Sequence, residues 1–85
     1  MKQTPSDPLA RLENVDWLIS NDGEITLGAF GPAKCAAVAT DESGCLAMLQ
    51  RIDGESLYQF LARLDAAIAR AWDEEVFTDE INPAR

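Results

Sequence analysis

The sequence predicts an α+β domain in which a four-stranded antiparallel β-meander is followed by a long α-helix packed across one face. Three observations lead to this prediction. Apolar and polar residues alternate over 15–29, which is the period of a β-strand. From residue 57 the large apolar residues recur every three or four positions, which is the period of an α-helix. Turn-forming residues separate the segments at 21–23, 41–44 and 53–54.

The N-terminal residues have little pattern. We expect residues 1–6 to be disordered, 7–75 to form the single domain, and 76–85 to form an acidic C-terminal tail. Asp7 and Pro8 can begin a short helical turn, because Asp is a good N-cap and Pro fits the first helical position. Asn14 would end that turn.

The first two predicted strands, 15–20 and 24–29, form a hairpin. A three-residue loop with Gly23 in the left-handed conformation makes one face wholly apolar, so we prefer it to a two-residue loop. The register then pairs Val15 with Ala29, Trp17 with Leu27, and Ile19 with Ile25.

The third and fourth predicted strands are 35–40 and 45–52, joined by a four-residue turn. This turn pairs Ala39 with Leu46 and Ala37 with Met48. Small residues opposite large ones would let a helix lie close to the sheet. On this register the face beneath the helix carries Val15, Trp17, Ile19, Ile25, Leu27, Leu46, Met48 and Ile52.

The predicted helix covers 56–73. Ser56 and Gln59 have the spacing of a capping box, which marks its beginning. One face of this helix would lie on the core and consists of Leu57, Phe60, Leu61, Leu64, Ile68, Ala71 and Trp72.

The other face of the predicted sheet is more apolar than a solvated face usually is. It could be covered by the N-terminal turn, by the C-terminal tail or by another protein molecule. We expect a homodimer here, and the candidate oligomer face consists of Leu18, Phe30, Val38, Ala47 and Leu49.

The net charge of −8 opposes binding to nucleic-acid phosphates and to anionic lipid. Residues 41–85 hold ten of the fifteen acids and only four bases. This charge either keeps a small protein soluble or forms a surface for a basic partner. We expect a cytoplasmic protein with no membrane association, because the chain has neither a long apolar run nor an apolar signal segment at its N-terminus.

The sequence lacks the residues and motifs of common catalytic sites. It contains no histidine, only two cysteines, and no glycine-rich phosphate loop or nucleophile motif. We therefore expect a protein that is not an enzyme and that uses neither a metal nor a cofactor.

Three roles follow, and the first is a non-catalytic interaction protein. It would bind or inhibit a basic partner, such as a nucleic-acid-binding protein, by mimicking the charge of DNA. Its candidate partner-binding residues lie on the exposed flank of the helix and in the acidic tail: Tyr58, Asp65, Asp73, Glu74, Glu75, Phe77, Asp79 and Glu80.

The second role is a structural or assembly subunit that acts through homo-oligomerisation. The third is a module that binds single-stranded nucleic acid. Four antiparallel strands followed by a helix resemble, in topology only, the dimeric single-strand-binding coactivator domains. The net charge disfavours this third role, since such domains need basic strands and stacking aromatic residues.

Overall fold

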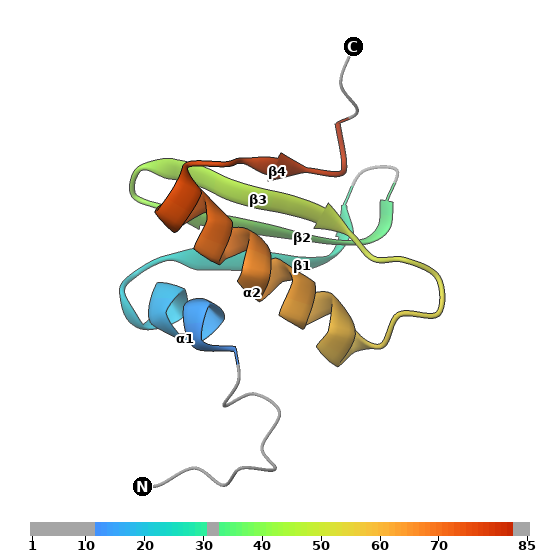
Figure 1. The fold of residues 1–85 in the computed structure, drawn as a ribbon. Coiled ribbons are helices and arrows are strands. Elements are labelled where there is room, and N and C mark those ends of the chain that lie inside the picture. The colour runs from blue at the N-terminus through green and yellow to red at the C-terminus, as the bar shows by residue number, and fades with distance from the viewer. Residues whose placement is uncertain (1–11, 31–32, 83–85) are drawn as a thin grey trace, which may run out of the picture.

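The computed structural model describes residues 12–30 and 33–82, which form a sheet with two helices on one face (Figure 1). The elements, in chain order, are α1 (Glu13–Ser20), β1 (Glu24–Phe30), β2 (Ala33–Asp41), β3 (Gly44–Gln50), α2 (Leu57–Glu74) and β4 (Thr78–Asp79). The sheet order is β1-β2-β3-β4, with the first three strands antiparallel and β4 parallel to β3. The α+β class is confirmed. The all-antiparallel meander that precedes a single helix is wrong, and the topological resemblance to the coactivator domains ends with it.

The first predicted strand, 15–20, is a helix in the structure. Leu12 and Leu18 are buried and Val15 packs against the core, which is a three-residue period, whereas Trp17 and Ile19 are 59% and 51% exposed. The same six residues fit both periods, and docking on α2 selects the helical one. The helical turn predicted from Asp7 lies outside the described residues except at its end, where Asn14 belongs to α1.

The register of β2 with β3 differs from the prediction by one residue. Ala37 pairs with Leu49 and Ala39 with Ala47, and a β-bulge follows between Ala39 and Thr40. A one-residue shift moves every side chain of the shifted segment to the opposite face. Ala47 and Leu49 therefore lie beneath α2, and Met48, which was predicted there, lies on the other face.

Small residues of the sheet lie beneath α2, although the register from which small residues were expected there is wrong. Ala37, Ala39 and Ala47 are fully buried in the cluster that α2 covers. Helix α2 contributes Phe60, Leu64, Ala67 and Ile68 to this core, all with no exposed surface. Leu57 and Ile52, which were predicted to face the core, are instead 46% and 58% exposed.

Helix α2 begins where the sequence predicted. The Ser56 hydroxyl accepts a hydrogen bond from the Gln59 backbone N–H at 3.0 Å, and the Gln59 side chain accepts one from the Ser56 N–H at 2.8 Å. This is the predicted capping box. Within the described part of the chain, no helix has the length and apolar character needed to cross a membrane.

Part of the predicted acidic tail is bound to the domain. Helix α2 ends at Glu74, its C-cap residue Glu75 has left-handed φ and ψ of 58° and 36°, and the chain turns back to form β4. The Glu80 N–H donates to the Met48 carbonyl at 2.7 Å. The Glu80 carboxylate also accepts a hydrogen bond from Arg63 of α2 at 2.8 Å. These bonds attach residues 78–80 to the edge of β3.

Candidate functional site

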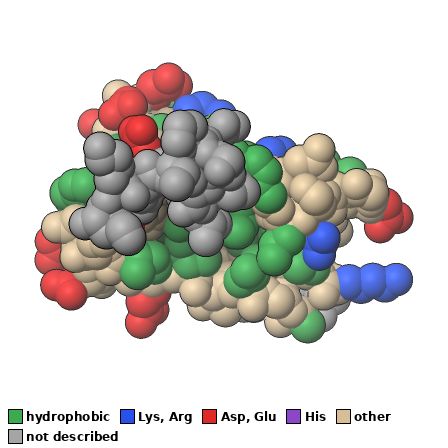
Figure 2. All heavy atoms as spheres, turned by 90° about the horizontal axis from the view of Figure 1, so that it is seen from below, with side chains coloured by type: hydrophobic (Ala, Val, Ile, Leu, Met, Phe, Trp, Pro, Cys, Tyr) green, Lys and Arg blue, Asp and Glu red, His purple; other side chains and the backbone are tan. Residues whose placement is uncertain are grey.

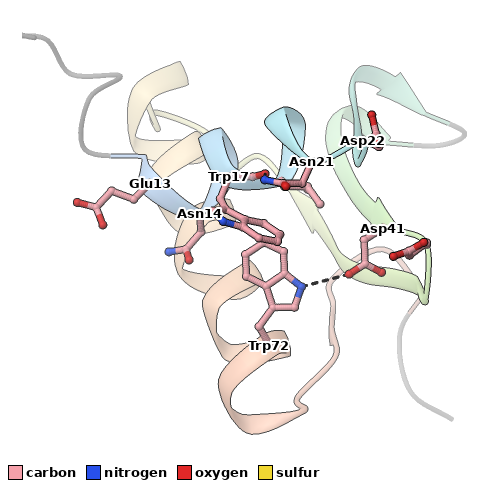
Figure 3. A pocket seen from close by; sticks show the side chains of 9 residues that line it. Glu13, Asn14, Trp17, Asn21, Asp22, Asp41 and Trp72 are labelled. Carbon is pink, nitrogen blue, oxygen red and sulfur yellow. Dashed lines mark hydrogen bonds between the residues drawn. The ribbon is translucent and has the colours of Figure 1, made fainter. Parts of the chain in front are cut away.

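An open pocket of about 640 Å³ lies between α1, the last turn of α2 and the β2–β3 turn (Figure 3). We call it the two-tryptophan pocket. Figure 1 shows the β2–β3 turn, the α1–β1 turn and the C-terminal end of α2 at the same end of the molecule. The pocket is lined by Glu13, Asn14, Trp17, Leu18, Asn21, Asp22, Asp41, Glu42 and Trp72.

Two perpendicular indole rings stand at the centre of the pocket. The centroids of Trp17 and Trp72 are 5.3 Å apart, and the ring planes meet at 76°. Trp17 comes from α1 and is 59% exposed, while Trp72 packs partly against the core from α2. An edge-to-face pair is a preferred aromatic arrangement, so the two helices hold the rings in a defined corner.

Asp41 fixes the position of Trp72. The Trp72 indole Nε1–H donates to Asp41 Oδ2 at 3.2 Å, which is the dashed line in Figure 3. The other oxygen, Oδ1, accepts from the backbone N–H and the hydroxyl of Ser43, at 2.8 and 2.7 Å. The hydrogen bonds from Ser43 first, and then the one from Trp72, lower the pKa of the Asp41 carboxyl below its usual value. Asp41 therefore stays ionised and holds both the turn and the ring.

The lining of the pocket is acidic. Its described lining residues include the carboxylates of Glu13, Asp22, Asp41 and Glu42, and no lysine or arginine is among them. Among the described residues, Glu13, Asp22 and Glu42 have no hydrogen-bond or ion-pair partner for their carboxylates. Most acidic side chains visible in Figure 2 gather toward the end of the molecule that carries this pocket. An apolar aromatic corner beside unpartnered carboxylates is suited to a cation.

Asp65, predicted to bind a partner, is engaged within the domain. Its Oδ1 accepts hydrogen bonds from the backbone N–H groups of Asn14 and Val15, both at 2.8 Å, and its Oδ2 accepts one from the Asn14 side chain at 3.0 Å. Leu12, at the N-cap of α1, supplies no side-chain cap. Asp65 therefore caps α1 from the neighbouring helix and holds Trp17 in the pocket.

Two predicted partner residues of the tail also make contacts within the domain. Asp79 Oδ1 accepts from the backbone N–H groups of Ile81 and Asn82, both at 2.9 Å. Glu80 forms an ion pair with Arg63 at 2.8 Å. Arg63 also bridges to Glu55 at 2.6 Å, so one guanidinium joins the tail to the loop that precedes α2.

Four of the remaining five predicted partner residues are exposed. Asp73, Glu74 and Glu75 are exposed at the end of α2, and Phe77 is 51% exposed just beyond it. Tyr58 is half-buried in the first turn of α2. A role for them in binding a partner stays a prediction.

The predicted oligomer face divides between the core and the opposite side of the sheet. Leu18, Ala47 and Leu49 are at most 1% exposed in the core beneath the helices, so their assignment to a free face is wrong. The cause is the helical form of 15–20 together with the shifted register of β3. Val38 is half-buried on the face opposite α2, because its neighbours Ala37 and Ala39 point toward the helix. The backbone of Phe30 belongs to β1, and its side chain lies outside the described residues.

The two-tryptophan pocket was not predicted. Trp17 had been placed in the core by an assumed strand alternation, and Asp22, Asp41 and Glu42 had been assigned only to turns. The signal available in the sequence was limited to the acidic residues of the turns at 21–23 and 41–44. No group of three or more Cys, Asp or Glu side chains in the described ranges could hold a metal ion.

Comparison with known proteins adds no family. No protein-family model matches the chain, and no curated protein or solved structure matches it either.

Proposed function

We propose that this protein is a non-catalytic interaction module that binds a basic segment of a protein partner in the two-tryptophan pocket. The observation that carries the proposal is the exposed Trp17 ring, set nearly perpendicular to Trp72, in a pocket whose described lining has four carboxylates and no base. A protein whose basic surface binds nucleic acid has the required chemistry, so inhibition by charge mimicry belongs to the same proposal.

The indole rings and the carboxylates of the pocket both attract a cation. Cations bind the faces of indole rings, an interaction of about 0.5–2 kcal/mol that increases as water is excluded. The unpartnered carboxylates of Asp22 and Glu42 add charge-assisted hydrogen bonds. A pocket of about 640 Å³ lies within the ordinary size range of ligand sites and can admit a long side chain.

The charge of the described residues supports the same class of partner. Residues 12–30 and 33–82 contain fourteen acids and four bases. Arg63 is paired with Glu55 and Glu80, and the Arg51 side chain donates to the Glu55 carbonyl at 3.0 Å. The field of the domain therefore attracts cations toward the pocket and repels nucleic acid.

The proposal is tested by fluorescence anisotropy of a labelled peptide rich in Lys and Arg, with an acidic peptide of equal length as the control. We expect the basic peptide to bind, and to bind less tightly as salt is raised to roughly physiological ionic strength. Trp17→Ala should weaken binding about 3- to 30-fold. Ile52→Ala is the matched control, because Ile52 is 58% exposed and lies outside the pocket. Equal affinity for wild type and Trp17→Ala would contradict the proposal.

A second candidate is self-association through the sheet face opposite α2. No described helix covers that face, which carries Val38 and Met48 as half-buried apolar side chains. We expect wild type to sediment as a dimer at high concentration, and Val38→Asp to remain folded and sediment as a monomer. A wild-type protein that stays monomeric would rule this candidate out.

A further inference from the structure

We infer that the cation selected by the two-tryptophan pocket is a guanidinium group, presented by an arginine side chain of the partner. This inference rests on the proposed function and deepens it. The pocket combines two flat aromatic walls with carboxylates that have no partner among the described residues, and each feature favours arginine over lysine.

The shape of the aromatic corner favours a planar cation. The two rings meet at 76° with centroids 5.3 Å apart, which gives two walls rather than a closed cage. A flat guanidinium can stack over the whole of one indole face. A tetrahedral ammonium gains most when aromatic rings surround it on several sides, and the described lining of the pocket has two rings.

The acceptors around the corner favour a group with many donors. Asp41 already uses both oxygens, toward Ser43 and Trp72. The carboxylates of Asp22 and Glu42, on two different turns, have no described partner and remain to accept. A guanidinium presents five N–H donors in one plane, so it can stack on a ring and still donate sideways to a carboxylate.

The domain already contains one arginine site built from the same parts. The Arg63 guanidinium carbon lies 5.6 Å from the Phe60 ring centroid. Its N–H groups donate to the carboxylates of Glu55 and Glu80, at 2.6 and 2.8 Å. An aromatic ring and two carboxylates thus hold a guanidinium within this fold. The two-tryptophan pocket presents aromatic rings and carboxylates, and its described lining residues include no cation.

The free energy lost when the cation leaves water also favours arginine over lysine. A guanidinium is more weakly hydrated than an ammonium, so less free energy is lost when it leaves water for an indole face. The cost of bringing lysine to the same position is larger because its charge is compact.

The experiment titrates the full chain with four Gly/Ser peptides of equal length and follows tryptophan fluorescence at low salt. The peptides carry two residues of one kind: arginine, lysine, trimethyl-lysine or citrulline, the last being a neutral analogue of arginine. We expect arginine to bind about 3- to 10-fold more tightly than lysine or trimethyl-lysine, and citrulline to bind most weakly.

Two variants identify the site. Trp17→Ala and Asp22→Asn should each weaken the arginine peptide about 3- to 30-fold and reduce its advantage over lysine. Asn is well tolerated at the left-handed φ of 71° that Asp22 adopts, so this variant keeps the turn. Asp53→Asn is the matched control, an exposed loop acid outside the pocket, and should leave binding unchanged.

Failure of the inference can be told from failure of the proposed function. If lysine or trimethyl-lysine binds as tightly as arginine and Trp17→Ala weakens both, the arginine inference is overturned and the basic-partner pocket stands. If the arginine peptide does not bind, or binds Trp17→Ala and Asp22→Asn as tightly as wild type, both are overturned.

Discussion

Replacing Asp65 should loosen α1 and the pocket together. In the structure one carboxylate on α2 accepts hydrogen bonds from two backbone N–H groups and one side chain in the first turn of α1. Asp65→Ala leaves these three donors without their acceptor. Because α1 carries Trp17, loss of the cap should also free one wall of the two-tryptophan pocket.

The magnitude follows from the number and kind of these bonds. Removing a helix cap costs typically about 1 kcal/mol. Hydrogen bonds to a charged group make a net contribution of about 1.5–3 kcal/mol each. The site is only partly buried, so water replaces part of the loss. We expect Asp65→Ala to lower the free energy of unfolding by about 2–3 kcal/mol, and Asp65→Asn, which keeps an acceptor oxygen but loses the charge, by about 1 kcal/mol.

Urea denaturation followed by circular dichroism measures this loss. With a slope of about 1 kcal/mol per molar urea for a small domain, the midpoint for Asp65→Ala should fall by about 2–3 M. Asp73→Ala is the matched control, because it removes an equal charge from an exposed position of the same helix. An Asp65→Ala midpoint equal to that of Asp73→Ala would refute the capping role. Tryptophan fluorescence of the folded variant reports whether Trp17 has separated from Trp72.

Three further predictions concern stability. Leu64→Ala should lower the free energy of unfolding by about 2–5 kcal/mol, because Leu64 has no exposed surface and the smaller side chain leaves a cavity. An unchanged urea midpoint would contradict the placement of Leu64 in the core. Glu75→Gly should stabilise the domain by about 0.4–1 kcal/mol, because Glu75 has a φ of 58° that glycine adopts without strain; a lower melting temperature would contradict this. The hydrogen bond from Arg63, first, and the one from the Ile52 backbone lower the pKa of Glu55 to about 2 from 4.5. A lowered pKa stabilises the fold above the unfolded-state value, and this contribution disappears as pH falls through the folded-state value. Glu55→Gln should therefore be less stable than wild type at neutral pH, and the difference should shrink between about pH 4.5 and about pH 2; a difference that is independent of pH would contradict the ion pair.

The sequence predicted α2 well because its signals are local. The capping box of Ser56 and Gln59 lies within one turn, and the apolar stripe repeats over the whole helix. The sequence could not assign α1, because residues 15–20 fit a strand and a helix equally. The residue that caps this helix, Asp65, lies 51 residues from Asn14 along the chain. Strand β4 has two residues and is attached by the long-range pair of Glu80 with Arg63, so its own sequence carries little signal.

The site was harder to predict than the fold for the same reason. The excess of acidic residues was visible in the sequence, and a basic partner could be argued from this charge. Which acids remain accessible depends on tertiary contacts: Asp65 and Glu80 are used within the domain, and Asp22 has no described partner. Trp17 reaches the surface only because α1 is a helix, so the wrong secondary structure placed the main aromatic residue in the core.

The most direct test of the central proposal is a two-dimensional ¹H–¹⁵N NMR titration with the arginine peptide, observing the indole N–H signals of the two tryptophans. If the two-tryptophan pocket holds the cation, the signals of Trp17 and Trp72 and the backbone signals of Asp22 and Glu42 should shift together with one dissociation constant, while Asp53 stays unmoved. Shifts confined to residues outside the pocket, or indole signals unchanged at saturating peptide, would contradict it.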